Sequence, residues 1–143
     1  MKHATTISAT LGIIGAALAN LFGGWDNALK LLVILMAVDF FSGLAVAGIF
    51  KNSKKTDLGG LESKAAWKGL CRKGSELTFV LIGYQIDIFM GIDFVRTAII
   101  IGFSVNELLS IIENMGLMGI QLPQGVYDAV ELLKKKGGEH HED

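Results

Sequence analysis

Several residue types on which small functional proteins depend are nearly missing from this chain. Its 143 residues include one cysteine and one proline. The single thiol, Cys71, excludes an internal disulfide bond. The scarcity of proline, together with 18 glycines, suits tightly packed membrane helices joined by short turns.

Catalytic and metal-binding motifs are missing from the sequence as well. It has no phosphate-cradling glycine motif, no HExxH or CxxC spacing, and no plausible serine or cysteine triad. His3 lies at one terminus, and His140 and His141 are adjacent in a charged tail, where they do not form a structural metal site. We therefore expect no enzyme, no bound metal and no cofactor.

The sequence instead contains long runs of uncharged, hydrophobic residues. Hydrophobic residues make up 51% of the chain and are concentrated in blocks, whereas a soluble core would spread them periodically. The block at residues 28–50 has the length of a bilayer-spanning helix, and between Leu31 and Phe50 it holds one charge, Asp39. A carboxylate at mid-span costs about 2.5–3.5 kcal/mol on insertion scales, so it usually faces a partner helix or a water-filled path. The block predicts a transmembrane helix with a functional residue at its centre.

Three further apolar blocks, at residues 4–22, 76–91 and 94–113, predict three more spans. Two alternatives remain: a signal peptide for the first block, cleaved after Ala17-Leu18-Ala19, or a shorter helix pair bending within the membrane for the last two. Small residues in steps of three and four predict close helix packing in the first block. The seam consists of Ala9, Gly12, Ala16 and Ala19 in the first block and of Gly43 and Ala47 in the second.

Basic residues cluster in residues 51–75, between the second and third blocks. Because this segment lies between two apolar spans, the positive-inside rule explains it better than binding to nucleic acid does. With the segment in the cytoplasm, four spans place both termini inside, and the basic run 134–136 agrees with that. Part of the segment predicts a short amphipathic helix on the membrane surface, with its lysines toward lipid phosphates.

The sequence thus predicts an all-α integral membrane protein with about four transmembrane helices. Residues 1–116 form the transmembrane domain. Residues 117–143 form a short cytoplasmic amphipathic helix and a charged tail. Pro123 suits the first turn of that helix, and Val126, Val130 and Leu133 share one face of it.

Polar residues at membrane depth are the candidates for function. Level with Asp39 we expect Tyr84 and Gln85, either of which could hydrogen-bond its carboxyl group. No lysine or arginine is expected at that depth, so desolvation favours the neutral acid. Glu107 is expected on the inner half of the last span, and a pore-lining role is weighed equally with hydrogen bonding inside one subunit. The candidates for ion pairs at the outer interface, where a structural role is favoured, are Asp87, Asp93 and Arg96.

Three stretches carry a family resemblance: VDFFSGLAVAGIFKN, LESKAAWKGLCRKG and NELLSIIENMGLMGIQLPQ. In order and spacing, over residues 28–136, they resemble the small bacteriophage holins of the toxin secretion/phage lysis type. In the second stretch the family shows a Ser-Lys pair, then a glycine, then a basic pair. The matching residues here, expected in the cytoplasm, are Ser63, Lys64, Gly69, Arg72 and Lys73.

The resemblance implies a multi-pass protein of the bacterial inner membrane. Such a protein accumulates harmlessly, oligomerises and opens lesions that release an endolysin or, in some clostridial relatives, a large toxin. The implied partners are membrane lipids and further copies of the chain, with the endolysin coupled through function and without a required contact. A small-ion channel, a transporter subunit, an antiholin-like inhibitor and a non-conducting membrane scaffold would show the same spans.

Overall fold

The computed structural model describes residues 2–55, 57, 60 and 62–138, which form helices and no strand. The predicted tail from residue 139 lies outside the described residues. The expected all-helical class is confirmed. The elements in order are α1 (Lys2–Leu21), α2 (Asn27–Ala45), a π-helical turn η1 (Val46–Phe50), α3 (Ser63–Met90), α4 (Val95–Leu117) and α5 (Gln124–Gly138).

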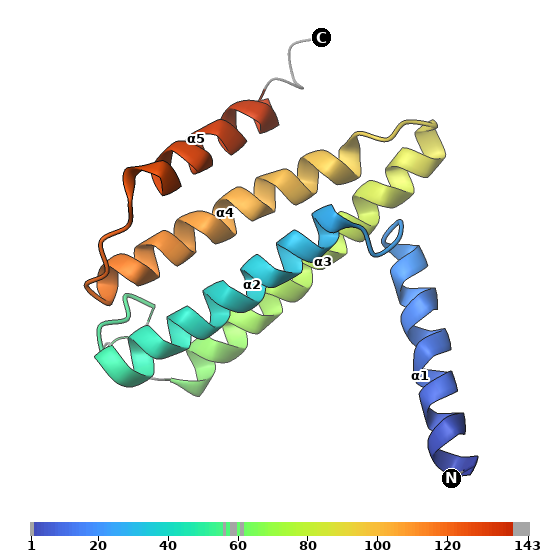
Figure 1. The fold of residues 1–143 in the computed structure, drawn as a ribbon, viewed down its shortest axis with the longest axis horizontal. Coiled ribbons are helices and arrows are strands. Elements are labelled where there is room, and N and C mark those ends of the chain that lie inside the picture. The colour runs from blue at the N-terminus through green and yellow to red at the C-terminus, as the bar shows by residue number, and fades with distance from the viewer. Residues whose placement is uncertain (1, 56, 58–59, 61, 139–143) are drawn as a thin grey trace.

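α2, α3 and α4 lie side by side as an antiparallel bundle (Figure 1). We call the end that holds the α1–α2 and α3–α4 connections the turn end, and the opposite end, with the α2–α3 connection, the loop end. The hydrophobic core lies in the half of the bundle near the turn end. It is formed by Leu29, Leu32, Met36, Val80 and Ile100.

The first and last helices differ in how they meet this bundle. α1 points away from it, whereas α5 folds back along α4 and buries Val130 (Figure 1). Along α1 the apolar side chains are exposed, and a side chain at Gly12 would meet no atom within 4 Å. In contrast, Ala47 is buried, and a Cβ on Gly43 would lie 3.7 Å from Asn114. Of the predicted seam, Ala9, Gly12 and Ala16 are therefore exposed on α1, whereas Ala19 is half-buried.

Within the described residues, two helical units are long and apolar enough to cross a bilayer. They are α2 with η1, Asn27–Phe50, and α4, Val95–Leu117. The apolar part of α1, Thr6–Leu21, is shorter. α3 is not among these units, because Lys73, Glu76 and Asp87 leave no stretch of 18 residues in it that is apolar enough. The expectation of four spans is thus supported for two of them.

α3 corrects the predicted boundary between the basic segment and the third apolar block. Residues 51–75 were expected to form a loop with a short helix of its own, followed by a span at 76–91. The structure has one unbroken helix, Ser63–Met90. No proline interrupts it, and Gly69 and Gly74 in its interior disfavour a helix by only about 1 kcal/mol each. Basic residues are thereby carried into the bundle.

Local signals fix the helix ends at the turn end. Asp26 caps α2, accepting a hydrogen bond of 2.9 Å from the Leu29 N–H. Gly91, at a φ of 68°, ends α3 in the left-handed conformation that glycine adopts without strain. The Asp87 carboxylate accepts from the N–H groups of Val95 and Arg96 at 2.8 and 2.9 Å. A carboxylate at that position also favours α4 through the helix dipole.

Candidate functional site

One lysine links acids from two other helices in the interior of the bundle. Lys73 Nζ, from α3, donates to Asp39 Oδ2 of α2 at 2.8 Å and to Glu107 Oε2 of α4 at 2.5 Å. Asp39, Lys73 and Glu107 are 2%, 7% and 3% exposed. All three helices of the bundle are therefore joined by buried ion pairs.

Two uncharged side chains, Ser42 and Asn114, lie beside Asp39 in the interior of the bundle. The Asn114 amide donates to Asp39 Oδ1 at 3.2 Å and to Ser42 Oγ at 2.8 Å. The Ser42 hydroxyl in turn donates to the Asp39 carbonyl oxygen at 3.1 Å. We call these residues the buried charge cluster: Asp39, Ser42, Lys73, Glu107 and Asn114.

The cluster lies near the midpoints of the two apolar helices. Asp39 and Glu107 each follow the first residue of their helix by 12 positions, which places both about 18 Å from the turn end at 1.5 Å per residue. At such depth an unpaired charge is expensive, and removing one partner of a buried ion pair typically costs about 3–5 kcal/mol. The cluster holds two carboxylates against one ammonium, so part of its charge is not balanced by Lys73.

The expectation that Asp39 bonds to Tyr84 or Gln85 is wrong. Gln85 Nε2 donates to the Leu21 carbonyl oxygen at 3.4 Å, and the Tyr84 ring packs against Gly23, both at the turn end. Asp39 was expected to be neutral because no cation was expected at its depth. Lys73 is such a cation, so the reason for expecting the neutral form does not hold. The error followed from assigning Lys73 to a cytoplasmic loop.

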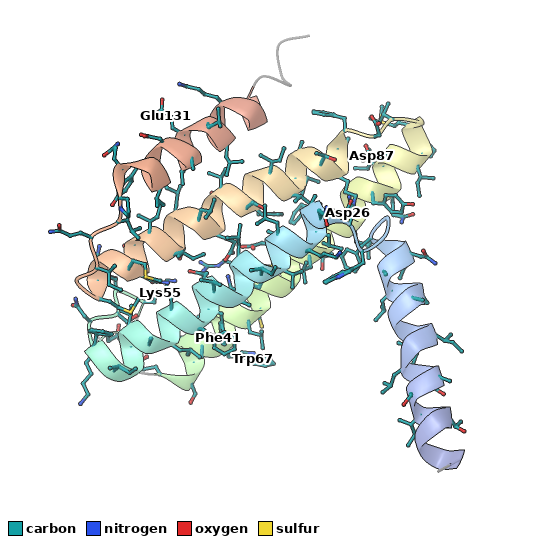
Figure 2. All side chains as sticks on the ribbon, viewed as in Figure 1. Asp26, Phe41, Lys55, Trp67, Asp87 and Glu131 are labelled. Carbon is teal, nitrogen blue, oxygen red and sulfur yellow. The ribbon has the colours of Figure 1, made fainter. Side chains whose placement is uncertain are left out.

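A second polar site holds the turn end together. The Arg96 guanidinium binds Asp26 in a bidentate pair, with Nη1–Oδ2 at 2.7 Å and Nη2–Oδ1 at 3.1 Å. Arg96 Nε also donates to the Phe22 carbonyl oxygen at 2.5 Å. We call Asp26, Asp87 and Arg96 the turn-end clamp. Figure 2 shows Asp26 and Asp87 at this end of the bundle and Lys55 toward the other.

The clamp changes the expected pairing at this interface. Arg96 forms its ion pair with Asp26, while Asp87 binds backbone N–H groups and Asp93 is exposed. The hydrogen bond from Arg96 holds the pKa of the Asp26 carboxyl below its ordinary value, against a smaller opposing effect of burial. The clamp ties the α1–α2 turn to the start of α4.

A small cavity of about 60 Å³ reaches the buried charge cluster from the loop end. Asp39 and Lys73 line its inner part, and Ser53, Lys55 and Arg72 lie among its other lining residues. The basic motif predicted from the family resemblance is divided by this geometry. Lys73 is buried, Gly69 faces Phe40, and Ser63, Lys64 and Arg72 are exposed. Among the described residues, no three histidine, cysteine or acidic side chains could hold a metal ion.

Sequence reasoning missed Lys73, Ser42 and Asn114 as partners of Asp39. A usable signal was present, because the buried residues of α3 follow one another in steps of seven, three and four, which is one face of a helix. That face consists of Lys73, Val80, Gly83 and Asp87. Extending the helix backwards from the apolar block would have placed Lys73 in the interior.

Among the described residues, the two bilayer-length apolar helices fit a membrane protein by length and composition, and the ion cluster lies buried at their midpoints. Residues 16–135 match the model of the bacteriophage holin family, and the chain belongs to that family, whose members are non-enzymatic membrane proteins.

Individual relatives agree with this assignment. The uncharacterized protein Lmo0128 of Listeria monocytogenes is 36% identical over 129 residues, which cover 90% of this chain and 86% of that protein. A protein named probable holin, from Bacillus phage phi105, is 31% identical over 119 residues, or 82% of each chain. The uncharacterized protein YqxH of Bacillus subtilis is 28% identical over 92% of this chain and 89% of its own length. No solved structure matches the chain.

Proposed function

We propose that this chain acts as a holin that oligomerises in the bacterial inner membrane and opens lesions during host lysis. An endolysin, or a toxin, would leave through these lesions without a required contact to the chain. The observation that carries the proposal is the buried charge cluster at the midpoints of two apolar helices in a holin-family chain. Within one protomer these charged groups pair with each other, and in an assembly the same groups could line a water-filled path.

The proposed topology is multi-pass, with four crossings and both termini in the cytoplasm. α1, α2 with η1, the apolar half of α3, and α4 would cross the membrane, and the loop end would face the cytoplasm. Support comes from the large apolar side chains exposed on α1 and near the end of α3, such as Ile13 at 71% and Phe89 at 89%. α5 exposes Glu131 and Lys135, so it would leave α4 and lie in the cytoplasm when α4 is surrounded by lipid.

Assembly would use the α1 part of the small-residue seam. Ala9, Gly12 and Ala16 are exposed in this chain and leave room for the close approach of a helix from another copy. Gly12→Leu with Ala16→Leu should delay or abolish lysis at an unchanged level of membrane insertion. Thr10→Leu with Ala17→Leu adds bulk to the opposite face and is the matched control. Lysis on the wild-type schedule with both seam leucines would refute this contact.

The function itself is tested by expressing the chain in bacteria while membrane potential and release of a cytosolic reporter enzyme are followed together. We expect the potential to collapse and the enzyme to be released at the same time. Collapse without release would identify a small-ion channel. Neither event, with the chain present in the membrane, would identify a scaffold or an antiholin-like partner, and either result overturns the proposal.

A further inference from the structure

A third carboxyl group lies beside the buried charge cluster. Glu76 follows Lys73 by one helical turn on α3 and interacts with the Glu107 carboxyl group across the α3–α4 contact. Its Oε2 atom is buried, and no hydrogen-bond partner for it exists among the described residues. A buried carboxylate oxygen without a donor is unfavourable, because ionised acids act only as acceptors.

Ser104 Oγ is a second buried polar atom without a hydrogen-bond partner among the described residues, and it lies at the height of Glu76 along the bundle. α3 and α4 are antiparallel, and contacts of Asp87 with Val95 and of Lys73 with Glu107 define their register. By this register Ser104 lies opposite Glu76, and it precedes Glu107 by three residues on the same face of α4. Ser104 is 3% exposed, and its Oγ has no hydrogen-bond partner in the described part of the chain.

The charges around this point do not balance when every acid is ionised. Asp39, Glu76 and Glu107 come from three helices, and Lys73 is the buried cation among them. Lys55 and Arg72 also act on the cluster, but both are exposed to solvent, which weakens their effect. Two neighbouring carboxyl groups in a medium of low dielectric avoid double ionisation by sharing one proton.

We propose that Glu76 is a proton-binding site: in the closed bundle Glu76 holds a proton beside the Glu107 carboxyl group, and loss of this proton loosens α3 from α4. The loop-end cavity is lined by Lys73, which precedes Glu76 by one helical turn. Glu76 is itself half-buried, so water can accept its proton. After release, three carboxylates face one ammonium, and their repulsion favours a wider, hydrated arrangement. The link to lysis, and the assignment of the loop end to the cytoplasm, rest on the proposed holin function.

Infrared spectroscopy of the full chain in lipid vesicles tests the proton site. We expect the carbonyl stretch of a protonated carboxyl group to persist at neutral pH and to disappear as the pH is raised. Glu76→Gln should remove this band at neutral pH. Glu113→Gln is the matched control, because Glu113 is exposed on α4 and pairs with Lys54 at 3.0 Å. Absence of the band from the wild-type chain, or its persistence in Glu76→Gln, overturns the proposal.

The regulatory consequence is tested in the lysis assay. Glu76→Gln mimics the protonated acid permanently, so it should delay reporter release relative to both the wild type and Glu113→Gln at equal membrane levels. Release on the wild-type schedule would overturn the regulatory role. If the wild-type chain never releases the reporter while the infrared band titrates as expected, the proton site stands and the proposed function fails.

Discussion

At the scale of single residues, Lys73 has the largest structural consequence. Its side chain separates Asp39 from Glu107, and without it the two carboxylates would face each other in the interior with no cation between them. Breaking a buried ion pair from one side leaves an uncompensated charge, whereas replacing all its members by neutral groups is often tolerated. The first kind of change should therefore cost much more stability than the second.

We predict that Lys73→Met lowers the free energy of unfolding in detergent by about 3–5 kcal/mol. Combining it with Asp39→Asn and Glu107→Gln should restore most of that loss, since neither of the two acids that Lys73 pairs with stays charged. Lys68→Met, at an exposed position on the same helix, is the control and should have little effect. Wild-type stability of Lys73→Met would contradict the ion pairs as described.

Asp26 provides a pH-dependent prediction. Its pKa lies below the ordinary value of 3.8 because Arg96 hydrogen-bonds the ionised form. The stabilisation by the clamp is therefore complete above that ordinary value and is lost as the pH falls through the lowered pKa. Asp26→Asn, which can still cap α2, should weaken this acid dependence of the melting temperature. Asp93→Asn, at an exposed position, should leave it unchanged, and an identical acid profile for Asp26→Asn would contradict the prediction.

At the scale of helices, α3 and α4 approach each other closely at Gly83. A Cβ there would lie 2.6 Å from Ile99 Cδ1 and 3.2 Å from the Arg96 Cα, so α4 itself would have to move. We predict that Gly83→Ala lowers the free energy of unfolding by about 1–3 kcal/mol. Gly102→Ala on α4 meets no atom within 4 Å and should be neutral or slightly stabilising. Equal melting temperatures for the two variants would contradict the close contact.

The sequence predicted those helices whose hydropathy pattern is visible within their own residues. The uniform apolar runs of α2 and α4 identify both helices with nearly the bounds found, and Asp39 within α2 was identifiable as a buried acid. The start of α3 was not predictable from hydropathy, because its first turns are polar and only the period of its buried face marks them as helical. The partners of Asp39 depended on that start. Nor does local pattern tell where α1 and α5 lie relative to the bundle.

At the scale of the whole molecule, orientation is the property that the proposed function most requires. Cys71 is exposed near the loop end, so an impermeant thiol reagent should label it only after the cells are permeabilised. Moving the thiol to the turn end, with Cys71→Ser and Asp93→Cys, should allow labelling from outside intact cells. Labelling of Cys71 in intact cells would reverse the proposed topology.

The spacing of the cluster along the chain bears on how the protein is made. Asp39 precedes Lys73 by 34 residues, and Glu107 follows Lys73 by the same 34. A ribosome therefore delivers an acid, then its base, then a second acid at equal intervals. When α2 has been synthesised, Asp39 has no counter-ion, and its burial in lipid alone would cost about 2.5–3.5 kcal/mol. We expect the nascent chain to leave the insertion machinery with α2 and α3 together, and α4 to enter a site in which the first ion pair already exists.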